Sequence, residues 1–214
     1  MADDSLYITV AGYSLVRGRN CPSGWRSAAS WRIWLEGAAE SATADVALPY
    51  VNISGPGHLS LLSASRKVEH LARLRLELSR IECLKEEFWW PSLYKESPYA
   101  KSRSPREVLE SLKESSYKFL VAYPMKKDPT WYLEPLEKRR RIMGEHIRIA
   151  VEATRSKPVN SITTYAFGIA HYEFLVIYEV DDVAHWIETV EALREAEARR
   201  WVVLEEPVVL GLRV

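Results

Sequence analysis

The chain has 214 residues, of which 47% are hydrophobic and 27% are charged. This composition is ordinary for a globular protein and allows one large domain or two small ones with a sizeable core. The 29 Lys and Arg residues balance the 29 Asp and Glu residues, so the overall charge gives no reason to expect nucleic acid or an anionic membrane as a partner.

Local features predict the cellular setting. The N-terminal sequence Met-Ala-Asp-Asp-Ser lacks the basic start and apolar run of a signal peptide, and no later window is apolar for long enough to span a bilayer. Cys21 and Cys83 are far apart and form no CxxC motif, which favours two free thiols in a reducing compartment. The basic run 138–141 alternates with acidic residues and favours a solvated helix face. We therefore expect a cytoplasmic protein that does not enter the membrane.

The first half of the chain predicts a strand, a helix, two strands joined through Gly55-Pro-Gly57, a second helix and a fourth strand. The expected ranges are 6–16, 25–40, 46–53, 58–62, 65–84 and 87–94. The polar segment 95–114 follows, with Ser-Pro-Tyr and Ser-Pro-Arg turns, and indicates a connector.

The second half repeats this order more clearly. Pro135 begins a predicted helix that Pro158 ends, because proline suits a first helical turn and cannot continue a helix. Asp181 and Asp182 begin a second helix that continues to about Arg199, since their carboxylates accept the free amides of its first turn. β-Branched and aromatic runs predict strands at 117–123, 161–167, 172–180, 201–204 and 207–212.

The repeated order β-α-β-β-α-β is that of the ferredoxin-like unit. We therefore predict an α+β protein with two tandem ferredoxin-like units, residues 1–97 and 117–214, and a connector over residues 98–116. Two such units would join their sheets edge to edge as an α/β barrel, which removes exposed strand edges and leaves a pocket between sheet and helices.

Chemically informative residues gather in the second unit. Tyr123-Pro-Met-Lys-Lys127 places a phenol and two ammonium groups at the end of a predicted strand. His146 is the only ionisable group on the apolar face of the helix that follows. Glu197 ends the apolar face of the last predicted helix, where an imidazole N–H would offset the cost of burying a carboxylate. A carboxylate behind a ligating histidine also fixes its tautomer and strengthens its bond to iron.

Simpler interpretations exist for each of these residues. A lone histidine on an apolar face is more often a hydrogen-bonded core residue, and a carboxylate in a last helical turn usually reaches solvent. Tyr123 suits a strand-end residue that packs under the next helix, and Lys126 and Lys127 suit two loop cations in water. From spacing alone, a His146–Glu197 ligand pair and a structural role stay open.

A series of ordered motifs over residues 117–211 resembles the chlorite dismutase family. They are Tyr-Pro-Met-Lys-Lys, Trp-Tyr, Met-Gly-Glu-His, Phe-Gly, Tyr-Glu-Phe, Leu-Arg-Glu-Ala-Glu-Ala and Pro-Val-Val-Leu-Gly. The family contains chlorite dismutases and the coproheme decarboxylases of haem biosynthesis. The resemblance implies a barrel of two ferredoxin-like units, usually assembled as a homopentamer; the N-terminal half matches in general pattern only.

The resemblance also implies a role for each matching residue. His146 stands at the position of the proximal haem-iron ligand, and Glu197 at that of its carboxylate partner. Tyr123 matches the tyrosine that becomes a radical in coproheme decarboxylases, and Lys127 the lysine near the reacting propionate. Met125 lines the same edge of the haem.

Ser161 is the departure from the family pattern, because chlorite dismutases place an arginine at this distal position and many decarboxylases a glutamine. Chlorite decomposition needs a cation there to hold the anion, so we expect no chlorite dismutase activity. The implied reaction is peroxide-dependent decarboxylation of coproheme to haem b, in which a Tyr123 radical takes a hydrogen atom from a propionate and Lys127 relays protons.

Two alternatives remain. The protein could be a non-catalytic member of the family that binds or carries haem through His146, which the serine at position 161 favours. It could also be a haem-free oligomeric scaffold with His146 in its core, although burying His146 and Glu197 without a ligand would be costly. The expected partners are coproheme or haem and hydrogen peroxide.

Overall fold

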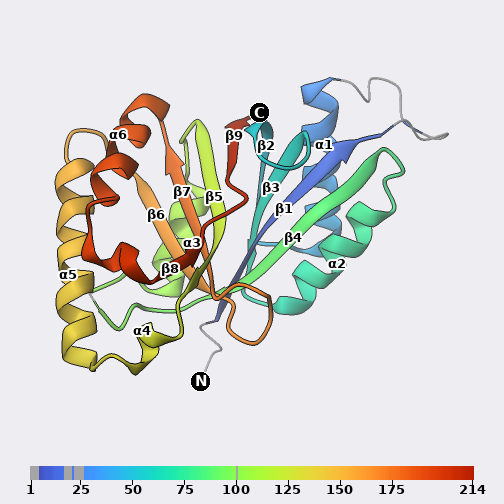
Figure 1. Cartoon of the computed structure of the whole chain (residues 1–214). Helices are drawn as coiled ribbons and strands as arrows, with labels where there is room; N and C mark the ends of the chain where they lie inside the picture. The colour runs from blue at the N-terminus through green and yellow to red at the C-terminus, as the bar shows by residue number, and fades with distance from the viewer. Residues whose placement is uncertain (1–4, 17–20, 22–26, 100) are drawn as a thin grey trace.

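The computed structural model describes residues 5–16, 21, 27–99 and 101–214 (Figure 1). The first half contains β1 (Leu6–Leu15), α1 (Ala28–Ala42), β2 (Val46–Ser54), β3 (Leu59–Ser65), α2 (Val68–Ser79) and β4 (Leu84–Tyr94). The expected start of the first helix at Trp25 lies outside the described residues. The helix α3 (Pro105–Lys113) follows in the expected connector, where Ser104 and Glu107 form a capping box.

The second half contains the elements that hold the predicted site. They are β5 (Phe119–Lys127), α4 (Thr130–Leu133), α5 (Leu136–Ala153), β6 (Asn160–Tyr165), β7 (Phe174–Val180), α6 (Val183–Leu193), the 3₁₀ helix η1 (Glu197–Trp201), β8 (Val202–Leu204) and β9 (Val209–Arg213). Asp182 caps α6 as predicted, because its side chain accepts from the amide of His185.

Within the described residues, the strands form one antiparallel sheet in the order β7-β6-β4-β1-β3-β2-β9-β5-β8. Because β7 also pairs with β5, all of these strands except β8 close into a barrel. The order β4-β1-β3-β2 in the first half and its counterpart β6-β7-β5-β9 in the second are both ferredoxin-like. The predicted barrel of two tandem ferredoxin-like units is therefore confirmed.

The two seams between these halves differ in extent. β2 and β9 pair along a run that begins at Tyr50↔Arg213 and ends at Ser54↔Leu210. β4 and β6 share the single pair Leu93↔Tyr165. The barrel is therefore held together mainly along the β2–β9 seam.

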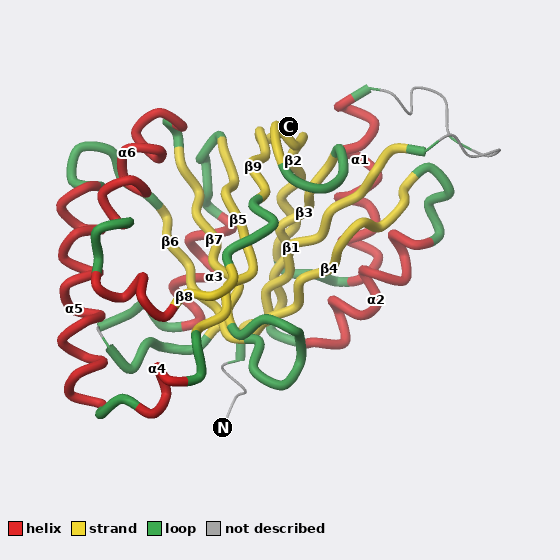
Figure 2. Tube along the Cα trace, in the orientation of Figure 1, coloured by secondary structure: helices red, strands yellow, loops and turns green. Residues whose placement is uncertain are grey.

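Alternation along each strand separates an inner from an outer core. Inward residues such as Ile8, Leu62 and Ile177 form the barrel interior, which α3 joins through Val108, Leu109 and Leu112. On the outer face of the first half, α1 and α2 bury Trp31, Leu35, Leu71, Leu74 and Leu78. Figure 2 shows α5 and α6 on the opposite outer face, over the strands of the second half. The site residues lie between that face and these two helices.

Cys21 and Cys83 form a disulfide, so the prediction of two free thiols is wrong. Their Cα atoms are 5.5 Å apart because β1 and β4 are antiparallel neighbours whose paired ends, Leu15 and Leu84, precede and follow the two cysteines. The prediction of a reducing compartment is therefore no longer supported by free thiols. No helix in the described part of the chain combines the length and apolarity needed to cross a bilayer.

Candidate functional site between the sheet and helices α5 and α6

Strand β5 presents Tyr123 on the outer face of the barrel. Its inward neighbour Ala122 lies in the barrel interior, whereas Val121 and Tyr123 pack in the outer cluster with Tyr178 and Trp186. Met125 follows on the outer face, half-buried, and its backbone carbonyl accepts from the amide of Glu173. The period of two along a strand therefore puts the predicted tyrosine and methionine on the side that faces the helices.

Helix α5 brings His146 to the same place. His146 and Tyr123 line one cavity of about 120 Å³, although they come from different elements. The remaining lining residues are Val121, Tyr178, Trp186, Val190, Leu193, Arg194, Arg199, Glu205 and Val208. The apolar members come from β5, α6 and the loop before β9, and the charged members Arg194, Arg199 and Glu205 come from the segment between the end of α6 and that loop. The structure thus joins two residues that the sequence predicted separately.

The imidazole of His146 is held in its neutral form. Burial lowers its pKa first, and the positive charges of Lys127 and Arg199 lower it further. Its Nδ1 atom is buried and has no hydrogen-bond partner among the described residues. A neutral imidazole with an unpaired ring nitrogen is the form of histidine that binds metal ions.

Glu205 is the carboxylate of this cavity. Arg194 Nη1 donates to its Oε2 at 2.7 Å, and Arg199 Nη1 donates to its Oε1. The charge of Glu205 also raises the pKa of His146, which opposes the effects of Lys127 and Arg199. A carboxylate between two guanidinium groups is therefore built into the cavity beside His146.

Glu197 does not pair with His146, contrary to the expectation from the sequence. It lies in η1 rather than on α6, which ends at Leu193. Its Oε2 accepts from Arg141 at 2.9 Å, and its amide donates to Glu145. The expected helix breaks before Glu197 because the extended backbone of Ala196 begins the separate 3₁₀ turn.

Tyr123 and Tyr178 face each other across the β5–β7 pair, with ring centroids 6.3 Å apart. Burial raises the pKa of Tyr123 well above its usual value, and the neighbouring Tyr178 and Glu205 raise it further. The pKa of Tyr178 is also raised, chiefly by burial. Both rings are therefore neutral phenols near neutral pH.

Lys127 is nearly enclosed, with 6% of its surface exposed. Its Nζ lies 4.3 Å from the ring centroid of Trp131, a cation–π contact, and its amide donates to Glu173. Burial lowers the pKa of Lys127 to about 8, and Arg199 adds to this effect. The lysine thus lies close enough to His146 to lower the pKa of its imidazole, and it can exchange a proton near neutral pH.

Ser161 is exposed on β6 and pairs with Tyr178 of β7. Its side chain therefore shares the outer face with Tyr178 and Tyr123. Its carbonyl oxygen accepts from Arg103 Nη2 at 2.8 Å. The residue offers a hydroxyl on this face, as the sequence predicted, while the nearby cation Arg103 is engaged with the backbone.

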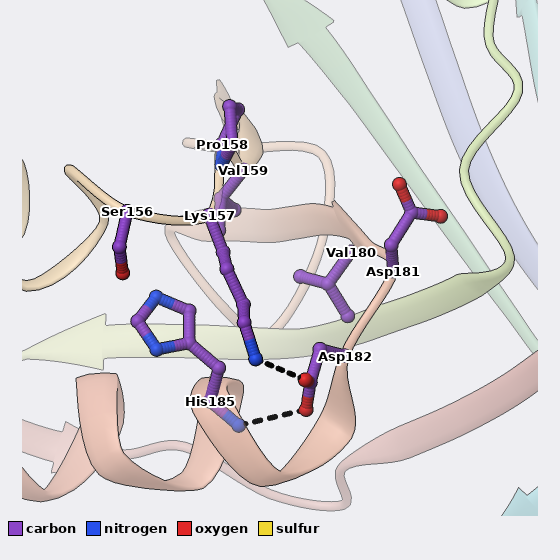
Figure 3. Close-up of a pocket in the computed structure, with 8 residues that line it drawn as sticks. All are labelled: Ser156, Lys157, Pro158, Val159, Val180, Asp181, Asp182 and His185. Atoms are coloured by element: carbon purple, nitrogen blue, oxygen red, sulfur yellow. Dashed lines mark hydrogen bonds and ion pairs between the residues drawn. The ribbon is translucent and has the colours of Figure 1, made fainter.

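A second cavity, of about 170 Å³, lies at the start of α6 (Figure 3). There Asp182 pairs with Lys157 and caps the helix, and the His185 ring lies beside Ser156 and Lys157. None of the predicted site residues lines this cavity. Lys157 and Asp182 pair with each other, and the cavity with His146 also contains Tyr123, so the latter is the better candidate site.

The residues of the candidate site fit an iron porphyrin in their chemistry. Such a group takes one neutral imidazole as an axial ligand and needs apolar walls. His146 supplies the imidazole, and Val121, Val190 and Leu193 supply part of the walls. The cavity is smaller than the roughly 300–1,000 Å³ usual for such ligands, so α5 must move away from the sheet to admit one. The structure describes every residue of α5, and Ile142 is the only one that is fully buried. Few buried side chains therefore anchor this helix to the rest of the protein.

Sequence reasoning missed Tyr178, Trp186, Arg194, Arg199 and Glu205. Tyr178 could have been found from the register of β5 with β7, once these strands were paired. Glu205 follows β8 in a loop, where no periodicity assigns it a face.

Comparisons with known proteins agree with this geometry. A family model described as chlorite dismutase matches residues 27–214. Among curated proteins, the chain is 31% identical over 96 residues to a coproheme decarboxylase of Mycolicibacterium smegmatis. That match includes 45% of this chain and 40% of the relative, so it spans less than half of the relative's length.

Solved structures match over nearly the whole chain. One protein, provisionally named a chlorite dismutase, has a TM-score of 0.81 and 30% identity, with 98% of this chain and 95% of that chain covered. A chlorite dismutase variant from Candidatus Nitrospira defluvii has a TM-score of 0.78 and 17% identity, with 100% and 93% covered. A heme-binding protein from Thermus thermophilus has a TM-score of 0.77 and 19% identity, with 98% and 91% covered. At these identities the last two support the fold alone.

Proposed function

Because this chain belongs to the chlorite dismutase family, we propose that it binds an iron porphyrin through His146 and decarboxylates coproheme to haem b, with hydrogen peroxide as oxidant. The observation that carries the proposal is that His146 and Tyr123, from α5 and β5, line one cavity. The likeness to a coproheme decarboxylase supports the choice of reaction.

Each residue has a role that its surroundings support. His146 would hold the iron through its neutral imidazole, and the bound iron porphyrin would supply peroxide-driven one-electron oxidation. Tyr123 is a buried phenol beside that ligand and gives up a hydrogen atom, which it then recovers from a propionate side chain. Lys127, with a pKa of about 8, donates or accepts a proton at its Nζ atom near neutral pH. Met125, two residues beyond Tyr123 on the same strand, would line the edge of the bound porphyrin.

The proposal excludes chlorite dismutase activity on the ground of charge. Ser161 presents no cation on the sheet face, and the guanidinium of Arg103 is bonded to the Ser161 carbonyl and to Ser111. Lys157, another basic residue near β6, is paired with Asp182. An anion such as chlorite therefore has no free cation at this position.

Titration of the purified protein with ferric coproheme, followed by peroxide and mass spectrometry of the porphyrin, tests the proposal. We expect saturable binding and stepwise loss of two CO₂. The Tyr123→Phe variant should bind coproheme as the wild type does and release no CO₂, because phenylalanine offers no hydrogen atom. The His146→Ala variant should lose the absorption spectrum of the bound complex. Binding that His146→Ala leaves unaltered would contradict the ligand assignment.

A second candidate function is haem binding without catalysis. Ser161 favours it, because a serine hydroxyl gives less help to peroxide chemistry than the glutamine of many decarboxylases. The result that would decide for this function is tight coproheme binding with an unchanged porphyrin after peroxide.

The proposal extends to a homopentamer in the cytoplasm. Family likeness is its only support for the pentamer, and light scattering of the purified protein tests it. The disulfide removes one of the observations that favoured a cytoplasmic location, the two free thiols.

A further inference from the structure

Three aromatic rings lie in a row beside the candidate site. The ring centroids of Tyr123 and Tyr178 are 6.3 Å apart, and those of Tyr178 and Trp186 are 4.3 Å apart. All three residues line the cavity that contains His146. They come from β5, β7 and α6, so the row crosses from the sheet to the helix layer.

The row ends at the nearly buried Trp186, one residue from an exposed position of α6. Trp186 is 8% exposed, and the next residue, Ile187, is 61% exposed. Around the rings lie apolar side chains, Val121, Val180 and Val190 among them. Electrons pass readily between aromatic rings this close, and the apolar surroundings keep water from the intermediate ring.

We propose that Tyr178 and Trp186 form a chain for one-electron transfer that connects the Tyr123 radical to the surface of α6. The source of the radical rests on the proposed function, in which peroxide is the oxidant. Tyr178 donates an electron and its phenolic proton to the Tyr123 radical, and Trp186 then donates an electron and its indole N–H proton to the Tyr178 radical. Trp186 is left oxidised by one electron, and a reductant of the thiol or ascorbate class restores it from solvent.

Such a chain protects the site when no propionate is in reach. A radical confined to Tyr123 would attack the protein around it, whereas one that reaches Trp186 can be reduced from outside. Another aromatic group, Tyr99, Trp131 and Trp201, forms a separate cluster. Trp201 is less buried than Trp186, so it is a sensitive control for oxidation directly from solvent.

The test treats the coproheme-loaded protein with peroxide until both reactive propionates are consumed, adds further peroxide together with a nitroso spin trap, and maps the radical adducts by peptide mass spectrometry. We expect adducts at Trp186 in excess of those at Trp201, the opposite of the order that exposure predicts. The Tyr178→Phe and Tyr123→Phe variants should lose the excess at Trp186. Decarboxylation without excess at Trp186 would overturn the chain and leave the proposed function intact.

A second measurement needs no macrocycle. Azide radicals from pulse radiolysis oxidise tryptophan in the apoprotein, and the indolyl absorption then decays as the tyrosyl absorption grows, which is the transfer between Tyr178 and Trp186 run in reverse through the same pair of rings. We expect Trp186→Phe and Tyr178→Phe each to reduce the amplitude of this intramolecular step, and Trp201→Phe to preserve it. An unchanged amplitude in Tyr178→Phe would reject the chain, even if coproheme fails to bind and the proposed function falls.

Discussion

Lys127 carries a charge that the fold holds almost out of water. Trp131 covers its ammonium group, and the nearest opposite charges, Glu173 and Glu205, only partly offset the burial. Its folded-state pKa of about 8 lies below the 10.5 of a solvated lysine. Between these two values the unfolded chain holds the proton more tightly, so stability rises with pH across this window. Below about pH 8 the folded protein bears the full cost of the buried charge.

Lys127→Met is therefore expected to stabilise the apoprotein at pH 7. The gain is at most about 3 kcal/mol from the pKa shift, reduced by the lost cation–π contact. It should shrink as the pH rises from 8 toward 10.5, since the lysine of the wild type then loses its charge in the folded state. Urea denaturation at several pH values measures the difference. Lys126→Met, one residue earlier and less buried, is the control and should change stability by less than about 0.5 kcal/mol.

Glu205 and Glu197 give a direct test of which carboxylate belongs to the cavity. Glu205→Gln should destabilise the apoprotein by about 1–3 kcal/mol, because Arg194 and Arg199 lose their shared charged partner. Glu197→Gln removes a pair with Arg141 that is largely exposed, and should cost no more than about 1 kcal/mol. Denaturant titration of the two variants compares them. A larger loss of stability in Glu197→Gln than in Glu205→Gln would favour the role for Glu197 that the sequence predicted.

At the level of single residues, the positions of Tyr123 and His146 follow from the sequence pattern because each lies in a regular element, while their roles stay predictions. Strand alternation puts Tyr123 on the outer face, and helical spacing puts His146 on the apolar face of α5. Glu205 lies in a loop, where no periodicity predicts the direction of its side chain. Its position depends on its ion pairs with Arg194 and Arg199, which form only when η1 and β8 have folded.

Among the elements, α3 differs most from expectation. The polar composition of residues 98–116 predicts a solvated connector, yet Val108, Leu109 and Leu112 are buried in the barrel interior. Their spacing of one, three and four residues places them on one side of a short helix. Three apolar residues on one side of a short helix are too few to be recognised in a polar segment, although they pack into the barrel interior.

Leu109→Ala should consequently destabilise the protein by about 2–5 kcal/mol, the usual cost of a cavity in a core. Glu110→Ala in the same helix is the control, because Glu110 is exposed and pairs only with Lys113. Thermal or urea unfolding of the two variants gives the comparison. Equal stability of Leu109→Ala and the wild type would mean that α3 does not contribute to the core.

The end of α6 at Leu193 could not be predicted from the sequence, for a different reason. The residues Arg194-Glu-Ala-Glu-Ala-Arg199 all favour helix, so propensity predicts that the helix continues. The chain instead turns at Ala196, where Glu145 of α5 accepts the amide of Glu197. A contact between distant elements thus outweighs a local preference of a few tenths of a kcal/mol per residue.

The whole molecule follows its sequence pattern closely, because two ferredoxin-like units have few other ways to cover their strand edges. The disulfide is the exception, since a separation of 62 residues between two cysteines carries no signal by itself. Only the register of β1 with β4 reveals that the two side chains meet.

Thiol titration of the protein unfolded without reductant should therefore find no free cysteine. Closing a loop of this length stabilises a fold by about 4 kcal/mol in the chain-entropy model, and often by less in practice. The Cys21→Ser, Cys83→Ser double variant should be destabilised to about that extent in urea. Two titratable thiols in the oxidised wild-type protein would show that the pair is not linked.

The two outer helix layers are packed to different depths. In the first half, α1 and α2 bury a continuous apolar face, whereas α5 buries Ile142 alone and leaves His146 beside a cavity. Regions with few buried contacts open at a lower free energy than the rest of a protein. The α5–α6 layer can thus swing outward in rare excursions while the barrel and the α1–α2 layer stay folded. The barrel strands of both units and the α1–α2 layer thus form a rigid frame, and the outer helices of the second unit alone control access to the cavity.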